Sequence, residues 1–145
     1  MINRRIFQLT VFSLVICARM AFAQVAIIAH KAVPKDTISQ SQLLDFYSCE
    51  IKSWHNKIPV VVFDLKPASE IREAFYKLLG KTPSRMKSIW LKKLLMGESN
   101  PPLALESEDE VLKKVAGTPG AIGFVSKTKV TGEVKVIVVI EKKEK

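Results

Sequence analysis

Short apolar runs alternate with helix-like segments along most of the chain, and this alternation constrains the fold more than any other feature. The runs at residues 25–29, 58–63, 121–125 and 134–140 are rich in β-branched residues and have the length of buried strands. Helical patterns separate the first three runs, and the last two runs follow each other at the end of the chain. This arrangement is typical of an α/β fold in one compact domain.

Each predicted helix begins at a residue that can cap it. Thr37 followed by Gln40 has the spacing of a capping box, and the helix after it is expected to run to about Tyr47. The remaining helices are expected over 70–79 after Ser69, over 83–96 after Thr82 with Pro83 in the first position, and from 108 to about 117 after Ser107.

The N-terminal segment has the order of a secretory signal. Arg4 and Arg5 precede an apolar run of 13 residues at positions 6–18, and Ala21-Phe22-Ala23 matches a signal peptidase site. A membrane span needs roughly 20 apolar residues, so the run is too short for a good anchor. We expect residues 1–23 to be removed on export to a bacterial periplasm or to the outside of the cell, with the periplasm as the expected location, which leaves one domain at residues 24–145.

Cleavage would lower the formal net charge from +9 to +6, because three arginines leave with the signal segment. A basic surface favours anionic partners in general. The lysines are spread along the chain, however, and the last five residues mix both signs, so we expect no nucleic-acid partner. Cys49 would be the only remaining cysteine, which excludes an internal disulfide; a buried free thiol is expected, with a bond to another chain left open.

No familiar catalytic, metal-binding or nucleotide-binding motif occurs in the sequence. His30 and His55 are the only histidines, and neither belongs to a metal-binding pair. We therefore expect no cofactor and no metal, and we do not expect an enzyme. Convergence of His55, Asp64 and Glu70 on one pocket would revive the enzyme hypothesis.

Five stretches form an ordered set that covers nearly all of residues 25–140. They are "VAIIAHKAVP" at 25–34, "ISQSQLLDFYSCEIKSW" at 38–54, "IPVVVFDLKPASEIREAFY" at 58–76, "GESNPP" at 97–102 and "TPGAIGFVS" at 118–126. Together they resemble the phosphate-binding-protein-like family of periplasmic solute-binding proteins, the extracytoplasmic components of ABC transporters.

The resemblance implies one lobe of the two-lobed class II binding-protein fold, with a central sheet of about four or five strands flanked by helices. Whole members bind their solute in a cleft between two lobes. A mature chain of 122 residues has room for one lobe, so a cleft would need a second copy, another chain or a membrane partner.

The resemblance also implies a site at the start of the helix over 70–79. Phosphate-binding relatives carry a pattern like Arg-x-x-Gly-Ser-Gly-Thr-Arg there, and the alignment places Ser69 on its serine and Arg72 on its last arginine. The departures from the pattern are Leu65 for the first arginine, Ala68 and Glu70 for the glycines, and Ile71 for the threonine. Cys49 likewise stands where the family often has glycine.

The implied ligands of a small anion such as phosphate are Ser69, Arg72 and the backbone N–H groups of Glu70 and Ile71, with Lys66 added from the turn. A helix N-terminus with unpaired N–H groups suits an oxyanion. The structural alternatives are an N-cap role for Ser69, worth about 1 kcal/mol, and for Arg72 an ion pair with Glu73 or Asp64 or a position in solvent.

Two functions follow as hypotheses. The first is an exported solute-binding-like protein that binds a small anion weakly and works with a membrane transporter or receptor, or with a second copy of itself. The alternative is an envelope protein–protein interaction or sensory accessory module that has lost solute binding.

Overall fold

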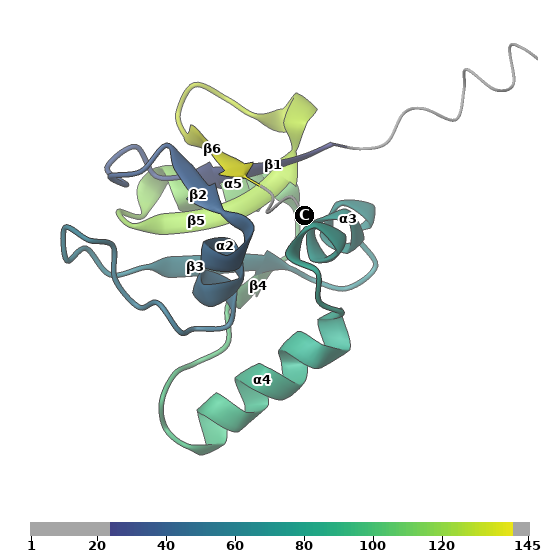
Figure 1. The fold of residues 1–145 in the computed structure, drawn as a ribbon. Helices are drawn as coiled ribbons and strands as arrows, with labels where there is room; N and C mark the ends of the chain where they lie inside the picture. The colour runs from purple at the N-terminus through teal and green to yellow at the C-terminus, as the bar shows by residue number, and fades with distance from the viewer. Residues whose placement is uncertain (1–23, 141–145) are drawn as a thin grey trace, which may run out of the picture.

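The computed structural model describes residues 24–140, in which a six-stranded sheet lies among helices (Figure 1). The predicted signal segment lies outside the described residues. The strands are β1 (Val25–Ala29), β2 (Thr37–Ser39), β3 (Val61–Leu65), β4 (Leu103–Leu105), β5 (Ala121–Ser126) and β6 (Lys135–Ile140). The helices are α2 (Gln40–Tyr47), α3 (Glu70–Leu79), α4 (Pro83–Leu95), α5 (Glu108–Gly117) and the 3-10 turn η1 (Lys127–Lys129).

The sheet is mixed, with strand order β2-β6-β1-β5-β3-β4. β1 pairs antiparallel with β5 and β6, whereas β3 runs parallel to both β5 and β4. The α/β class is confirmed, but the sheet has six strands where the sequence predicted about four or five. The two additional strands, β2 and β4, lie at the edges and have three residues each, which is too short for a recognisable period.

Helices cover both faces of the sheet. Gly123 of β5 faces α5, where an added Cβ would lie 2.9 Å from Val111. The next residue, Phe124, faces α3 and stacks on Phe75 with ring centroids 4.0 Å apart. Because successive residues of a strand point to opposite faces, α3 and α5 lie on opposite sides of the sheet. Tyr47 of α2 joins the α3 side, with its ring centroid 4.6 Å from that of Phe75.

Helix α4 stands apart from the sheet at the lower end of the molecule (Figure 1). It packs through one face only, where Met86 and Trp90 are buried. The indole Nε1 of Trp90 donates a hydrogen bond of 2.6 Å to the carbonyl oxygen of Tyr47, at the end of α2. The buried Met86 and Trp90 side chains therefore join α4 to the rest of the fold.

The predicted caps are confirmed at three of the four helices. Ser69, Thr82 and Ser107 each accept a hydrogen bond from the backbone N–H three residues on. At α2 the prediction was wrong, because Thr37 lies in β2. Ser39 caps this helix and forms a complete capping box with Gln42. Pairing of residues 37–39 with β6 moves the start of the helix two residues along.

The second strand also begins later than predicted, at Val61 rather than Ile58. Residues 52–60 fold back on themselves before it: Trp54 N–H donates to the Ile58 carbonyl at 2.8 Å, and Val60 N–H donates to the Lys52 carbonyl at 3.0 Å. The apolar run correctly predicted a strand, but hydrogen bonds within this loop engage backbone groups of Ile58 and Val60, the first part of the predicted run.

Candidate functional site

The turn between β3 and α3 sets the position of the predicted site. Lys66 N–H donates to the Leu105 carbonyl at 3.0 Å, which continues the β3–β4 pairing by one residue. Ala68 then adopts φ +75°, a left-handed conformation that costs a residue with a Cβ roughly 1–2 kcal/mol. Cys49 has φ +63° as well. The family resemblance places glycine at both positions, and in this chain Ala68 and Cys49 adopt there a backbone conformation that favours glycine.

Ser69 caps α3, which is the structural alternative to the ligand role predicted for this residue. Its hydroxyl oxygen accepts a hydrogen bond of 3.4 Å from the N–H of Arg72. Glu70 and Ile71 are the first two helical residues, and N–H groups at these positions have no acceptor within a helix. The Glu70 side chain is exposed and the Ile71 side chain is buried. Backbone N–H groups are therefore what these two residues have to offer an anion.

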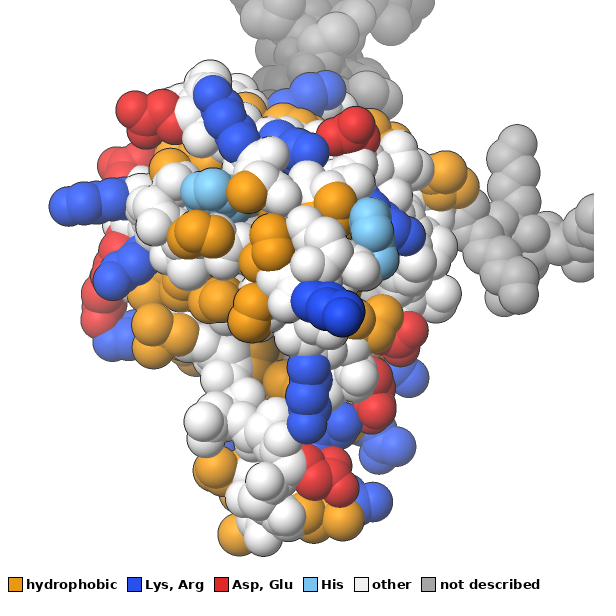
Figure 2. All heavy atoms as spheres, turned by 90° about the vertical axis from the view of Figure 1, so that its left-hand side faces the viewer, with side chains coloured by type: hydrophobic (Ala, Val, Ile, Leu, Met, Phe, Trp, Pro, Cys, Tyr) orange, Lys and Arg blue, Asp and Glu red, His pale blue; other side chains and the backbone are white. Residues whose placement is uncertain are grey.

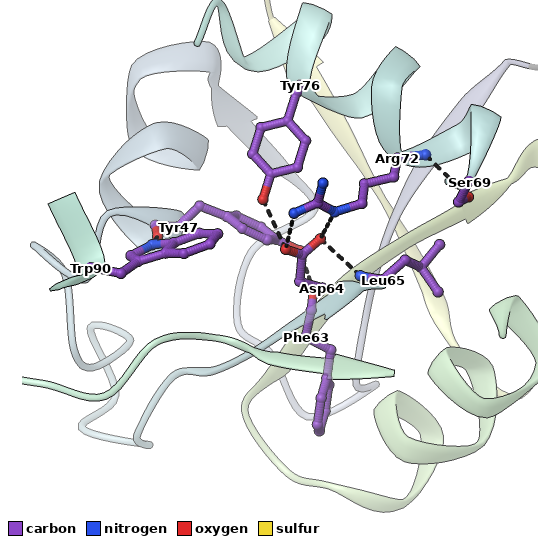
Figure 3. Close-up of polar contacts among 8 residues, drawn as sticks. All are labelled: Tyr47, Phe63, Asp64, Leu65, Ser69, Arg72, Tyr76 and Trp90. Carbon is purple, nitrogen blue, oxygen red and sulfur yellow. Dashed lines mark hydrogen bonds and ion pairs between the residues drawn. The ribbon is translucent and has the colours of Figure 1, made fainter. Parts of the chain in front are cut away.

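Arg72 does not extend toward solvent but pairs with Asp64 of β3 (Figure 3). Its Nε lies 3.3 Å from Oδ1 of Asp64, and its Nη2 lies 3.2 Å from Oδ2. The hydroxyl of Tyr76 donates to Oδ2 at 2.9 Å, and the Leu65 N–H donates to Oδ1 at 2.8 Å. The Asp64 carboxylate, on a residue only 2% exposed, is thus fully engaged.

The environment of this carboxylate suppresses ionisation of two tyrosines. Burial, followed by the nearby negative charge of Asp64, raises the pKa of Tyr76 far above its ordinary value. Burial and the same carboxylate also raise the pKa of Tyr47 well above its ordinary value. The Tyr47 hydroxyl donates to the Phe63 carbonyl at 2.8 Å. Both phenols therefore act as neutral hydrogen-bond donors inside the fold.

A second helix N-terminus opens on the same part of the surface as α3. Leu65 of β3 and Leu105 of β4 are paired in parallel, so both strands end at one edge of the sheet. A capped helix follows each strand, starting after Ser69 and after Ser107. Between them lies a hollow of about 470 Å³, which we call the helix-start hollow. Its lining residues are Leu65, Lys66, Pro67, Ala68, Ser69, Glu106, Ser107, Glu108 and Lys129.

Charges of both signs border the helix-start hollow. Lys66 forms an ion pair with Glu106, and both side chains are exposed. Nζ of Lys129 lies 3.1 Å from Oδ1 of Asp109, and both side chains of this ion pair are exposed. The Glu108 carboxylate accepts a hydrogen bond from the Ser126 N–H. An anion in the hollow would meet two lysines, two helix starts and two lining carboxylates.

Of the predicted site residues, Lys66 and Ser69 line the hollow, and Glu70 and Ile71 follow directly on α3. Arg72 points the other way, toward Asp64 (Figure 3). Sequence reasoning missed Ser107 and Lys129. The signal for Ser107 was present, because a capped helix after a second strand brings another N-terminus to the same edge whenever the two strands are parallel and adjacent. Adjacency of β3 and β4 was not visible, since β4 has only three residues.

The structure does not bring His55, Asp64 and Glu70 together. His55 is exposed in the loop before β3, Asp64 is buried near the end of β3, and Glu70 is exposed beyond that end. His30 has a local structural contact, because its Nδ1 accepts a hydrogen bond of 3.0 Å from the Ala32 N–H. Within residues 24–140, no three His, Cys, Asp or Glu side chains are grouped as metal ligands. Nor does this part of the chain contain a helix long and apolar enough to cross a membrane.

Solved structures give the comparison that bears on this geometry. A structure described as a phosphate ABC transporter substrate-binding protein from Clostridium perfringens, with bound phosphate, matches at a TM-score of 0.66 and 23% identity, over 79% of this chain and 44% of that one. An ABC-type phosphate transport receptor from Vibrio cholerae matches at 0.64 and 22% identity, over 79% of this chain and 45% of that one. PstS from Borrelia burgdorferi matches at a TM-score of 0.60 and 15% identity, over 79% of this chain and 46% of that one.

The chain has the fold of the phosphate-type substrate-binding proteins. It spans less than half of the length of each of these structures. No protein-family model and no curated protein matches the sequence. The expected resemblance is thus confirmed at the level of the fold, and the structures that share this substrate-binding fold belong to binding components of transport systems.

Proposed function

We propose that this chain is an exported solute-binding-like protein that binds a small oxyanion such as phosphate, weakly, in the helix-start hollow. The observation that carries the proposal is that two capped helix N-termini, at Ser69 and Ser107, open on one hollow. Helix starts present unpaired N–H groups and a partial positive charge, which together favour anions. The bound phosphate in one structure of the same fold supports this choice of ligand.

In this proposal the backbone N–H groups of Glu70 and Ile71 donate to the anion from α3. The Ser69 hydroxyl accepts from the Arg72 N–H, and its own proton stays available for an anion oxygen. Lys66 adds charge from the turn, and Lys129, which also lines the hollow, adds a second positive charge. Arg72 supports the site indirectly, because its ion pair with Asp64 fixes the first turn of α3 against β3.

Weak binding is proposed because carboxylates share the hollow. Glu106 already neutralises Lys66, so an incoming anion has to displace this carboxylate or accept its repulsion. Glu108 lines the hollow as well. An arginine would bind an oxyanion through two parallel hydrogen bonds, but the guanidinium of Arg72 makes such contacts with Asp64 instead.

The partner proposed for this protein is a membrane transporter or receptor, or a second copy of the chain.

The ion pair of Arg72 with Asp64 also favours the second candidate function, an envelope interaction or sensory module without solute binding. An arginine retained at the motif position but used inside the fold is what loss of a ligand site would leave behind. The two functions differ in whether a purified chain binds an anion at all.

Calorimetric titration of residues 24–145 with phosphate and with sulfate, at low and moderate salt, tests the proposal. This segment includes all six strands and the whole described core. We expect saturable heat that decreases in Ser69→Ala and in Lys66→Gln. The matched controls are Ser84→Ala and Lys113→Gln, which change exposed residues of α4 and α5 away from the hollow. No heat with either anion, or equal losses in the controls, would contradict it.

A further inference from the structure

The C-terminal half of helix α4 presents leucines that the rest of the described chain leaves uncovered. Leu91 is 53% exposed, Leu94 is 45% exposed and Leu95 is 79% exposed. At 100° per residue, Leu91 and Leu95 lie on the side opposite Met86, which is completely buried. Side chains of this kind project from the lower end of the molecule, where α4 lies (Figure 2). The outer leucines therefore add nothing to the core.

The same face is strongly basic. Residues 81–97 contain five Lys or Arg residues and no Asp or Glu. Lys93 lies on the packed side and forms an ion pair of 2.7 Å with Glu50. Arg85, Lys87 and Lys92 are exposed, and none of them takes part in an ion pair within residues 24–140. We call Arg85, Lys87, Leu91, Lys92 and Leu95 the outer α4 face.

Around the helix, the cations flank a middle strip that holds Leu91 and Leu95, with Ser84 and Ser88 in its first half. Taking Leu95 as the centre, Lys87 lies about 80° to one side, and Lys92 and Arg85 lie about 60° and 80° to the other. Long basic side chains in such positions can keep their charges in a polar layer while their methylene stems lie along an apolar one. Two exposed leucines with cations on both flanks match the pattern of a helix surface that lies on a membrane interface.

We propose that the outer α4 face binds the surface of a bilayer rich in anionic phospholipid. Charge decides between this occupant and a second copy of the chain, because a symmetric contact through this face would bring two sets of cations together without a carboxylate from residues 81–97. An anionic lipid surface instead attracts each cation, and its acyl layer accepts leucines that protrude from a convex helix. The contact does not use the helix-start hollow and does not depend on anion binding there.

Co-sedimentation of residues 24–145 with sucrose-loaded vesicles tests this proposal. The probe vesicles contain equal parts of phosphatidylglycerol and phosphatidylethanolamine, and the reference vesicles contain phosphatidylcholine alone. Omitting residues 1–23 keeps their apolar run from binding the vesicles. We expect binding to the anionic vesicles that weakens as salt is added, and at least roughly tenfold weaker binding to the neutral ones.

Two variants separate the parts of the outer α4 face. Arg85→Gln/Lys87→Gln/Lys92→Gln should weaken binding to anionic vesicles by roughly tenfold or more, since each surface cation contributes to the attraction. Leu91→Gln/Leu95→Gln should also weaken it, because the apolar contact is lost. Circular dichroism checks that each variant is folded, which is expected because all five side chains are exposed.

The matched control is Lys31→Gln/Lys113→Gln/Lys114→Gln, which removes the same charge from exposed positions elsewhere. It should keep most of the binding. Equal loss in this control would overturn the proposal, because net charge alone would then explain the binding. Unchanged binding in the leucine variant, or no binding of the unaltered chain to anionic vesicles, would also overturn it and leave the face to a protein partner.

Discussion

Arg72 and Asp64 form a buried ion pair in which two guanidinium nitrogens face the two carboxylate oxygens at 3.3 and 3.2 Å. The Arg72 side chain is 13% exposed and that of Asp64 is 3% exposed. Arg72 also lies over the ring of Tyr76, with 4.8 Å between its Cζ and the ring centroid. Arg72, which the family motif indicates as a hydrogen-bond donor to an anion, thus connects α3 to β3.

Removal of one partner of this pair should be strongly destabilising. We expect Asp64→Ala to lower the free energy of unfolding by about 3–5 kcal/mol, because it leaves a buried guanidinium without its counter-ion. Urea unfolding followed by circular dichroism measures the change. Asp64→Asn/Arg72→Met, which removes both charges, should cost less than the sum of its two single variants, with a coupling of at least about 1 kcal/mol. Additive effects would show that the pair contributes nothing as a unit.

Gly120 should not tolerate a side chain. It adopts φ +80°, and an added Cβ would lie 2.1 Å from the carbonyl oxygen of Pro59. We expect Gly120→Ala to lower the free energy of unfolding by about 2–4 kcal/mol, from left-handed strain and from the clash. Gly117→Ala is the matched control, since a Cβ there meets nothing within 4 Å. Thermal unfolding of the two variants should differ clearly; similar midpoints would argue against this turn geometry.

Alkaline pH should destabilise the fold through Tyr47 and Tyr76, the only tyrosines of the chain. Both folded-state pKa values are raised, so the unfolded chain loses these phenolic protons first, at pH values near 10. The stabilisation is complete below that pH and declines above it, by up to about 1.4 kcal/mol per pH unit for each tyrosine.

Tyrosinate absorbance and circular dichroism, recorded together from neutral to alkaline pH, measure this effect. Ionisation should appear only as the chain unfolds. Tyr76→Phe should show a shallower loss of stability with pH, because one of the two tyrosines no longer titrates. Ionisation of either tyrosine near its ordinary pKa in a folded chain would contradict the buried hydrogen bonds described here.

Glu106→Gln should strengthen anion binding in the helix-start hollow. The substitution removes a carboxylate from the lining and releases Lys66 from its ion pair. Calorimetry with phosphate should show an affinity increase of roughly twofold to fivefold at low salt, since an exposed charge pair is worth about 1 kcal/mol or less. Glu133→Gln, an exposed change outside the hollow, is the control. Equal or weaker binding in Glu106→Gln would argue against an anion at Lys66.

Local signals predicted much of the fold. The bounds of α3 follow from the Ser69 cap and from Gly80, whose left-handed φ of +72° ends the helix. The starts of α4 and α5 follow in the same way from Thr82 and Ser107. These features depend on residues close in sequence, so a single chain reveals them. β2 and β4 depend instead on pairing with distant strands, and three residues carry no period of their own.

In the candidate site, too, the sequence revealed the local contacts but not the contacts between distant elements. Ser69 could be identified as a cap because its partner lies three residues away. The partner of Arg72 lies eight residues away on another element, and the sequence left Glu73, Asp64 and solvent as alternatives. The second helix start was missed because it reaches the hollow only through the β3–β4 pairing. Contacts between elements thus decide which parts of the motif are available to a ligand.

The central claim is that an oxyanion binds where α3 and α5 begin, and an amide NMR titration with phosphate tests it most directly. Two-dimensional spectra of residues 24–145 would be recorded as phosphate is added at constant pH and ionic strength. The account predicts saturable shifts that are largest for the backbone amides of residues 68–72 and 106–110. Shifts that are absent, or that are largest elsewhere in the fold, would contradict it.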